Sequence, residues 1–185
     1  MKEKVLISLN DITQQAISGH YDAHGGIGDG HCVIAFSFGY RKMADGIEPG
    51  ISNQDLAKFI EVNIKNKPLI LQFEIADALR GNYDIYRIEK HRRSGEYLGT
   101  DEVAKQAFDI MKSKNWKTAI IVAHPHHIPR VDAVCRKLGI ETIVPKGLEK
   151  IRFDPESDQE WTKNKEAWAI RERLAIKFYS ENGLI

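Results

Sequence analysis

The chain has 185 residues, a length that predicts one domain spanning residues 1–185. Hydrophobic residues make up 42% of the chain and charged residues 29%, and this balance excludes wholesale disorder. The 27 Lys and Arg residues nearly balance the 26 Asp and Glu residues. The formal net charge of +1 therefore argues against a protein that coats nucleic acid by neutralising its phosphates.

Cysteine usage and hydropathy indicate the compartment. Cys32 and Cys135 stand in apolar surroundings, which favours two buried free thiols in a reducing compartment, with one disulfide as the alternative. The apolar run at 5–9 is too short for the core of a signal peptide. No stretch approaches the roughly 20 apolar residues of a membrane span. The expected location is the cytoplasm.

Short apolar runs alternate with helical patterns along the chain. Runs of this length, rich in aromatic and β-branched residues, predict strands that are buried on both faces, as in a parallel sheet. They occupy 32–38, 69–73, 84–88, 118–123 and 140–145. One helix is predicted to start at Ser52 and Asn53, which are good capping residues, and another at Thr100 as N-cap. Three more helices are predicted over 74–80, 128–138 and about 159–182.

This alternation predicts an α/β fold, a three-layer Rossmann-like sandwich with a mostly parallel five-stranded sheet. Ligands of such folds bind beyond the carboxyl ends of the strands. The C-terminal helix carries Trp161 and Trp168 on one face, and the spacing favours core packing over a cofactor site.

The densest group of functional side chains is AHPHHIPR at 123–130, which follows a predicted strand and enters a helix. Free N–H groups at a helix start attract anions, so we expect His124, His126 and Arg130 to bind a phosphate or carboxylate, and His127 to act as acid, base or donor. Two alternatives stay open. These residues could only cap a helix on a solvated rim, or the histidines could supply two ligands of a metal site.

Further candidates lie in the loops that follow other strands. The glycine-rich loop at 38–53 matches neither the Walker lysine motif nor Gly-x-Gly-x-x-Gly, yet it could wrap a phosphate-bearing ligand. Glu96 stands just before the predicted cap Thr100 and could orient a histidine. The segment at 20–31 is either a lid or a flexible entry segment. The ligand-binding residues predicted from these loops are Gly39, Tyr40, Arg41, Asn53, Glu74 and Thr100.

The segment TAIIVAHPHHIPRVDAVCRKLGI resembles the signature of the bacterial YdcF/SanA/ElyC-like proteins, in which a strand leads to a histidine, an arginine and a helix. The family's histidine and arginine correspond to His127 and Arg130. The family's upstream pattern is matched by Glu96, Thr100, Glu102 and Ala104, while Val103 replaces an asparagine. The resemblance covers about 33–145. It implies a Rossmann-like fold, a poorly characterised activity linked to envelope biology in several relatives, and a nucleotide-type ligand such as S-adenosylmethionine.

These observations predict a protein that binds an anionic or nucleotide-type small molecule, and they leave open whether it is an enzyme. As a hydrolase or transferase at a phosphoryl centre, it would use Arg130 to neutralise charge and His127 to move a proton, with Glu96 orienting His127. One alternative is a metal-dependent hydrolase built on His124, His126 and His127. Another is a non-catalytic sensing or interaction domain that docks through its C-terminal helix.

Overall fold

The computed structural model describes residues 8–185, so the expectation about a signal-peptide core falls largely outside the described range. In chain order the elements are α1 (Leu9–Ser18), β1 (Cys32–Ala35), β2 (Arg41–Met43), β3 (Gly46–Glu48), α2 (Gly50–Asn63), β4 (Leu69–Gln72), α3 (Phe73–Ala78), β5 (Ile85–Ile88), α4 (Thr100–Ser113), β6 (Thr118–Val122), α5 (Ile128–Lys137), β7 (Glu141–Ile143) and α6 (Lys165–Glu181). Single turns of 3-10 helix lie at Ile27–Asp29, Leu148–Lys150 and Glu160–Thr162.

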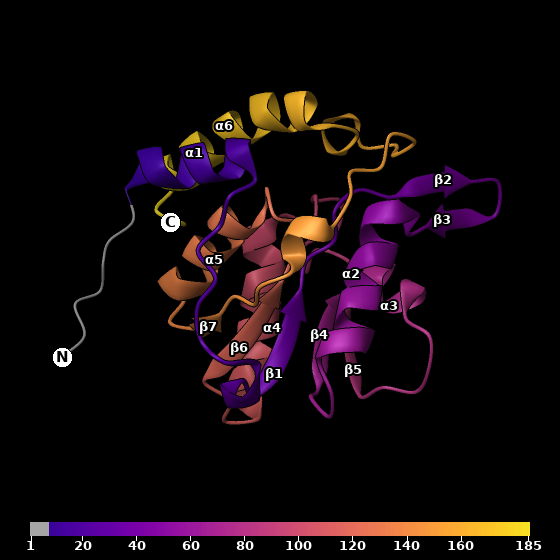
Figure 1. The fold of residues 1–185 in the computed structure, drawn as a ribbon, viewed down its shortest axis with the longest axis vertical. Coiled ribbons are helices and arrows are strands. Elements are labelled where there is room, and N and C mark those ends of the chain that lie inside the picture. The colour runs from indigo at the N-terminus through magenta and orange to yellow at the C-terminus, as the bar shows by residue number, and fades with distance from the viewer. Residues whose placement is uncertain (1–7) are drawn as a thin grey trace.

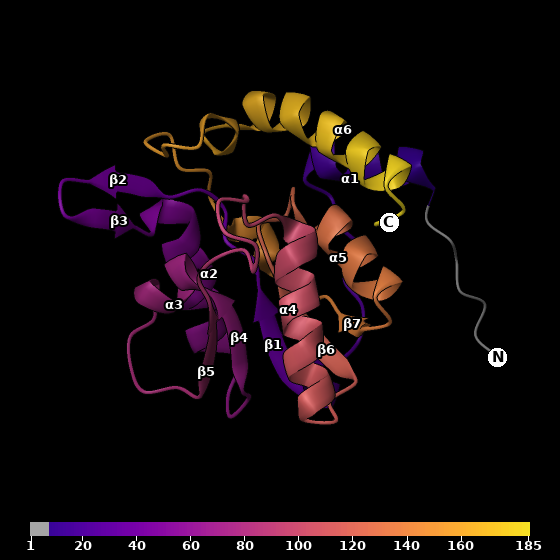
Figure 2. The same ribbon diagram turned by 180° about the vertical axis from the view of Figure 1, so that it is seen from behind.

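Five strands form one parallel sheet in the order β5-β4-β1-β6-β7, which confirms the predicted α/β sandwich. Strand β1 lies at the centre, with Val33 opposite Leu69 on one side and Ile120 on the other. Every residue of β1 and β4 is buried, which explains why these strands read as continuous apolar runs. Figure 1 shows α2 over one face of the sheet, and the reversed view in Figure 2 shows α4 over the other.

Helix α6 crosses the edge of the sheet toward which β1 points, beside α1 (Figure 1). Trp168 anchors this helix, with only 3% of its surface exposed, whereas Trp161 is half-buried. The core role predicted for the tryptophans therefore holds fully for Trp168 and in part for Trp161. None of the helices within residues 8–185 combines the length and apolar character that a membrane crossing needs.

Several predicted boundaries differ from the observed ones. Helix α2 begins at Gly50, so Ser52 and Asn53 are buried in its first turn and do not cap it. Helix α4 is preceded by Gly99 as N-cap, and Thr100 is its first residue. The hydroxyl of Thr100 is thus available for tertiary contacts. The C-terminal helix begins later than predicted, at Lys165, and the loop after β1 contains the antiparallel pair β2–β3.

Helix α1 was not anticipated from the sequence. Ser8 and Asp11 form a reciprocal capping box at its start, and Ile12 and Ala16 pack with Ile176 of α6. Both cysteines are free and buried, as predicted. Burial raises the pKa of the Cys32 thiol to about 12, so this thiol stays protonated and unreactive.

Candidate functional site

A cavity of about 870 Å³ lies at the carboxyl edge of the sheet, where ligands of parallel α/β folds bind. Its walls come from the loops after β1, β4, β5 and β6 and from α6, which covers the edge. The lining residues with polar or aromatic side chains that bear on function are Ser37, Tyr40, Glu74, His91, Glu96, Tyr97, Thr100, His127, Arg130, Trp161, Arg171, Glu172 and Tyr179.

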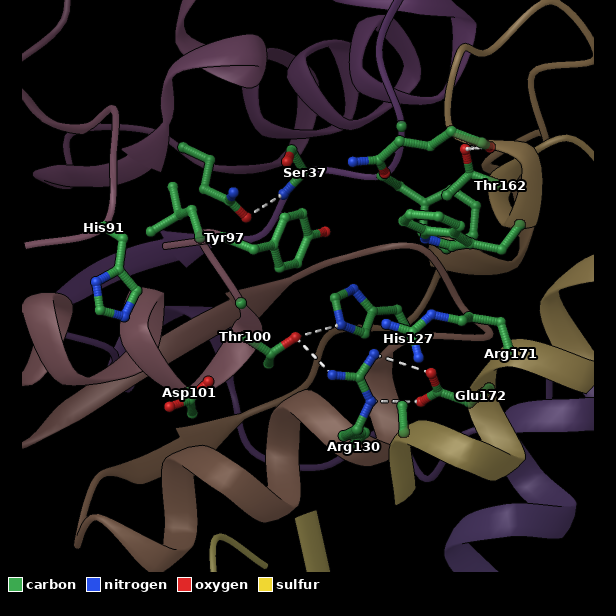
Figure 3. A pocket seen from close by; sticks show the side chains of 18 of the residues that line it. Ser37, His91, Tyr97, Thr100, Asp101, His127, Arg130, Thr162, Arg171 and Glu172 are labelled. Atoms are coloured by element: carbon green, nitrogen blue, oxygen red, sulfur yellow. Dashed lines mark hydrogen bonds and ion pairs between the residues drawn. The ribbon is translucent and has the colours of Figure 1, made fainter. Parts of the chain in front are cut away.

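Three of the predicted residues form one hydrogen-bonded group (Figure 3). Arg130 Nη1 donates to Thr100 Oγ1 over 2.7 Å, and Thr100 Oγ1 lies 2.9 Å from His127 Nε2. Because the arginine can only donate, the threonine hydroxyl accepts from Arg130, and its own hydrogen can be donated to Nε2. We assign this donation, which puts the imidazole proton on Nδ1.

The assigned Nδ1–H of His127 has no acceptor among residues 8–185 and is buried. Burial lowers the pKa of His127 well below its usual range, and the positive charge of Arg130 adds to this shift. The ring is therefore neutral at physiological pH. His127 can therefore donate a hydrogen bond to a ligand, but it does not carry the extra proton that a general acid would transfer.

Two residues of α6 hold the side chain of Arg130 in place. Its Nε and Nη2 donate to the two carboxylate oxygens of Glu172 over 2.7 and 2.8 Å, and its guanidinium lies 4.9 Å from the centre of the Tyr179 ring. Burial opposes the charge of Arg130, but the Glu172 carboxylate outweighs this effect and raises the pKa of the guanidinium. The two-donor fork expected to bind a ligand anion is thus occupied by Glu172.

Glu74 supplies a second titratable group on the cavity wall. It stands in the first turn of α3, directly after β4, and only 7% of its surface is exposed. Burial raises the pKa of its carboxyl to about 7. Its Oε2 is buried and has no hydrogen-bond partner in the described part of the chain. Near neutral pH this carboxyl can therefore both accept and donate a proton.

Gly39, Tyr40, Glu74, Glu96, Thr100, His127 and Arg130 all line the cavity, whereas Arg41, Asn53, His124 and His126 do not. Arg41 donates from Nε and Nη2 to Asp154 over 2.8 and 2.6 Å. Asn53 accepts from the N–H of Phe38 and donates to the carbonyl of Gly39, so it shapes the loop beside the cavity. The structure thus gives Arg41 and Asn53 supporting contacts with the chain.

The first two histidines of the cluster at 123–130 are also engaged by the chain itself. The ring of His124 stacks on Phe38 with 3.9 Å between ring centres, and His126 Nδ1 lies 2.8 Å from the carbonyl of Ala16. Residues 8–185 contain no group of three or more His, Cys, Asp or Glu side chains placed to hold a metal ion. The metal alternative thus has no ligand set in the described part of the chain.

Glu96 contacts a different histidine from the one expected. It lies 3.4 Å from His91 Nε2 and 3.6 Å from Arg93, and its carboxylate is half exposed at the cavity. The side chain that hydrogen-bonds His127 is Thr100. The orienting role expected for Glu96 therefore passes to Thr100.

Other cavity residues were not expected at the site from the sequence: Ser37, His91, Tyr97, Arg171, Glu172 and Tyr179. A signal for Glu172 exists in the sequence, because it stands four residues after Trp168 and seven before Tyr179, within the buried stripe of α6. A charged residue in an apolar stripe requires a partner. The positions of Tyr97 and Arg171 carry no comparable signal.

Comparison with known proteins found no match: no protein-family model, no curated protein and no solved structure matches the chain.

Proposed function

We propose that this protein binds a phosphate-bearing or nucleotide-type small molecule in the cavity and catalyses proton transfer on it. The observation that carries the proposal is a pair of buried polar atoms without protein partners, His127 Nδ1 and Glu74 Oε2, which belong to residues lining one cavity. A buried polar atom without a partner costs about 1–3 kcal/mol. A ligand that bonds to both atoms removes this cost and gains affinity.

The two groups suit different roles. Glu74 has a pKa of about 7, and a catalytic acid or base works best when its pKa lies near the operating pH. His127 is neutral and polarises the ligand as a hydrogen-bond donor, with its ring fixed by Thr100. Glu74 thus takes the acid–base role that the sequence suggested for His127.

The resemblance to YdcF/SanA/ElyC-like proteins fits this proposal. The residues that carry it include Thr100, His127 and Arg130, which form one hydrogen-bonded group although they come from two separate elements. S-adenosylmethionine therefore belongs among the ligands to be tried, together with nucleotides and sugar phosphates.

Isothermal titration of the full chain with these compounds tests the proposal. Glutamine preserves a hydrogen-bonding group near the position of Nε2 but removes the Nδ1 donor. We expect His127→Gln to weaken binding of any ligand by about 10- to 100-fold. The matched control is His20→Gln, an exposed histidine outside the cavity. Failure of all compounds to bind, or equal binding by both variants, would refute the assignment.

Catalysis is tested separately with any compound that binds. Turnover should depend on a group with a pKa near 7, and Glu74→Gln should abolish it while leaving the compound bound. Persistent turnover in Glu74→Gln would remove Glu74 from the mechanism.

A further inference from the structure

Two guanidinium groups and one carboxylate face the centre of the cavity. Figure 3 shows Arg171 directing its guanidinium toward the space beside His127 and Arg130, while Glu172 bonds to Arg130. Arg171, Glu172 and Tyr97 all line this cavity. Glu172 can balance only one of the two cations.

Four other carboxyl groups line the cavity. Asp101 is paired with Lys105 at 2.9 Å, Glu89 is paired with Arg87 at 3.0 Å, and Glu96 lies 3.6 Å from Arg93. Glu74 forms no ion pair in the described chain, and burial raises its pKa to about 7, so it is only partly charged at neutral pH. Arg171 forms no ion pair with any carboxylate of residues 8–185. Arg171 is therefore the cavity cation that has no carboxylate partner in the described chain, and it is exposed to solvent.

The neighbours of this charge are hydrogen-bond donors. Arg171 lies over the ring of Trp161 at 5.3 Å, a contact that restrains the guanidinium without consuming its N–H groups. His127 offers its Nδ1–H. The Tyr97 ring also points into this space (Figure 3), although 64% of the residue is exposed.

From this convergence we infer that Arg171, held on Trp161 and assisted by Tyr97 and His127, binds the anionic group of the ligand. The inference rests on the proposed function, and it assigns the binding of the anionic group to Arg171 in place of Arg130. Arg130 is the residue that the sequence selects, but its fork is neutralised by Glu172, so its part is to hold Thr100 and His127 in place. Arg171 is free to pair with an oxyanion such as a phosphoryl group.

Titration of the full chain with inorganic pyrophosphate at constant ionic strength tests this assignment. A constant ionic strength is needed because screening by salt weakens any exposed charge pair. Arg171→Gln should weaken binding roughly tenfold or more, and Arg171→Lys should weaken it less because lysine keeps the charge but not the fork. The matched control is Arg173→Gln, an exposed arginine of the same helix outside the cavity, which should bind like the parent.

Two outcomes would overturn the inference: equal binding by Arg171→Gln and the parent, or no binding of pyrophosphate to the parent. Its failure is distinguishable from failure of the proposed function. If pyrophosphate binding is insensitive to Arg171, but His127→Gln still weakens the compounds of the wider panel, the cavity binds ligands and only the Arg171 assignment falls. If nothing binds in either titration, both proposals fall.

Discussion

The buried ion pair between Glu172 and Arg130 gives the sharpest test of how this site is held together. Glu172 is completely buried, and both of its oxygens accept hydrogen bonds from Arg130, whose side chain is 8% exposed. In Glu172→Gln the side chain keeps its shape but loses its charge. The variant therefore leaves the cation of Arg130 buried without a counter-ion, and the nearby charge of Arg171 adds to the repulsion.

The expected cost follows from these contacts. Removing one partner of a buried ion pair typically destabilises a protein by about 3–5 kcal/mol, because the remaining charge stays desolvated. For a chain of this length 1 kcal/mol corresponds to roughly 2–4 °C in Tm, so the midpoint should fall by about 6–20 °C. Glu181→Gln on the same helix is the matched control. Glu181 is exposed and only 3.8 Å from Lys177, so its loss should cost no more than about 0.5 kcal/mol.

Thermal unfolding followed by circular dichroism, with urea unfolding at 25 °C, measures both variants. A loss below about 1 kcal/mol in Glu172→Gln would refute the reasoning. A double variant, Arg130→Met with Glu172→Met, separates charge from packing. Replacing a whole buried pair with apolar side chains is often neutral, so the double variant should regain most of the lost stability. If it is as unstable as Glu172→Gln, an uncompensated charge is not the cause.

Three further predictions concern stability. Burial raises the pKa of Glu74 in the folded state to about 7, so the free energy of unfolding should fall by up to about 3 kcal/mol as pH rises from about 4.5 to 7. Urea unfolding across this pH range should show a smaller fall for Glu74→Gln than for the parent. His124→Phe keeps the stacking on Phe38 and removes a buried Nε2 without a partner in the described chain, but it also removes the Nδ1 that accepts a long hydrogen bond of 3.4 Å from the His126 N–H; the net gain in stability at pH 7 should therefore stay below about 1 kcal/mol. Because burial lowers the pKa of His124, the gain should grow as pH falls below about 6.5, and a constant gain would contradict this account. Truncation before Gln159 removes Trp168 and Glu172 and should unfold the monomer, as seen by loss of near-ultraviolet circular dichroism; a folded truncated chain would show that α6 is dispensable.

The sequence determined the fold to a large extent. The apolar runs at 32–38, 69–73 and 118–123 correspond to the central strands. Both faces of these strands are covered, so successive side chains on either face are apolar. Helix boundaries were less accurate. Ser52, Asn53 and Thr100 are favourable capping residues by type, but tertiary contacts engage the side chains of all three. Local preference was outweighed there by hydrogen bonds to residues distant in sequence.

The sequence also located the candidate site, since the carboxyl ends of parallel strands meet at one edge and Glu74, Thr100, His127 and Arg130 follow or face those ends. It could not assign their partners. Glu172 lies 42 residues beyond Arg130 in the chain, and only the docking of α6 brings its carboxylate against the guanidinium. That contact neutralises Arg130 and leaves Arg171 as the free cation among the described cavity residues. Charge pairing in a buried site depends on distances of a few ångströms between separate elements, and the tertiary structure alone sets those distances.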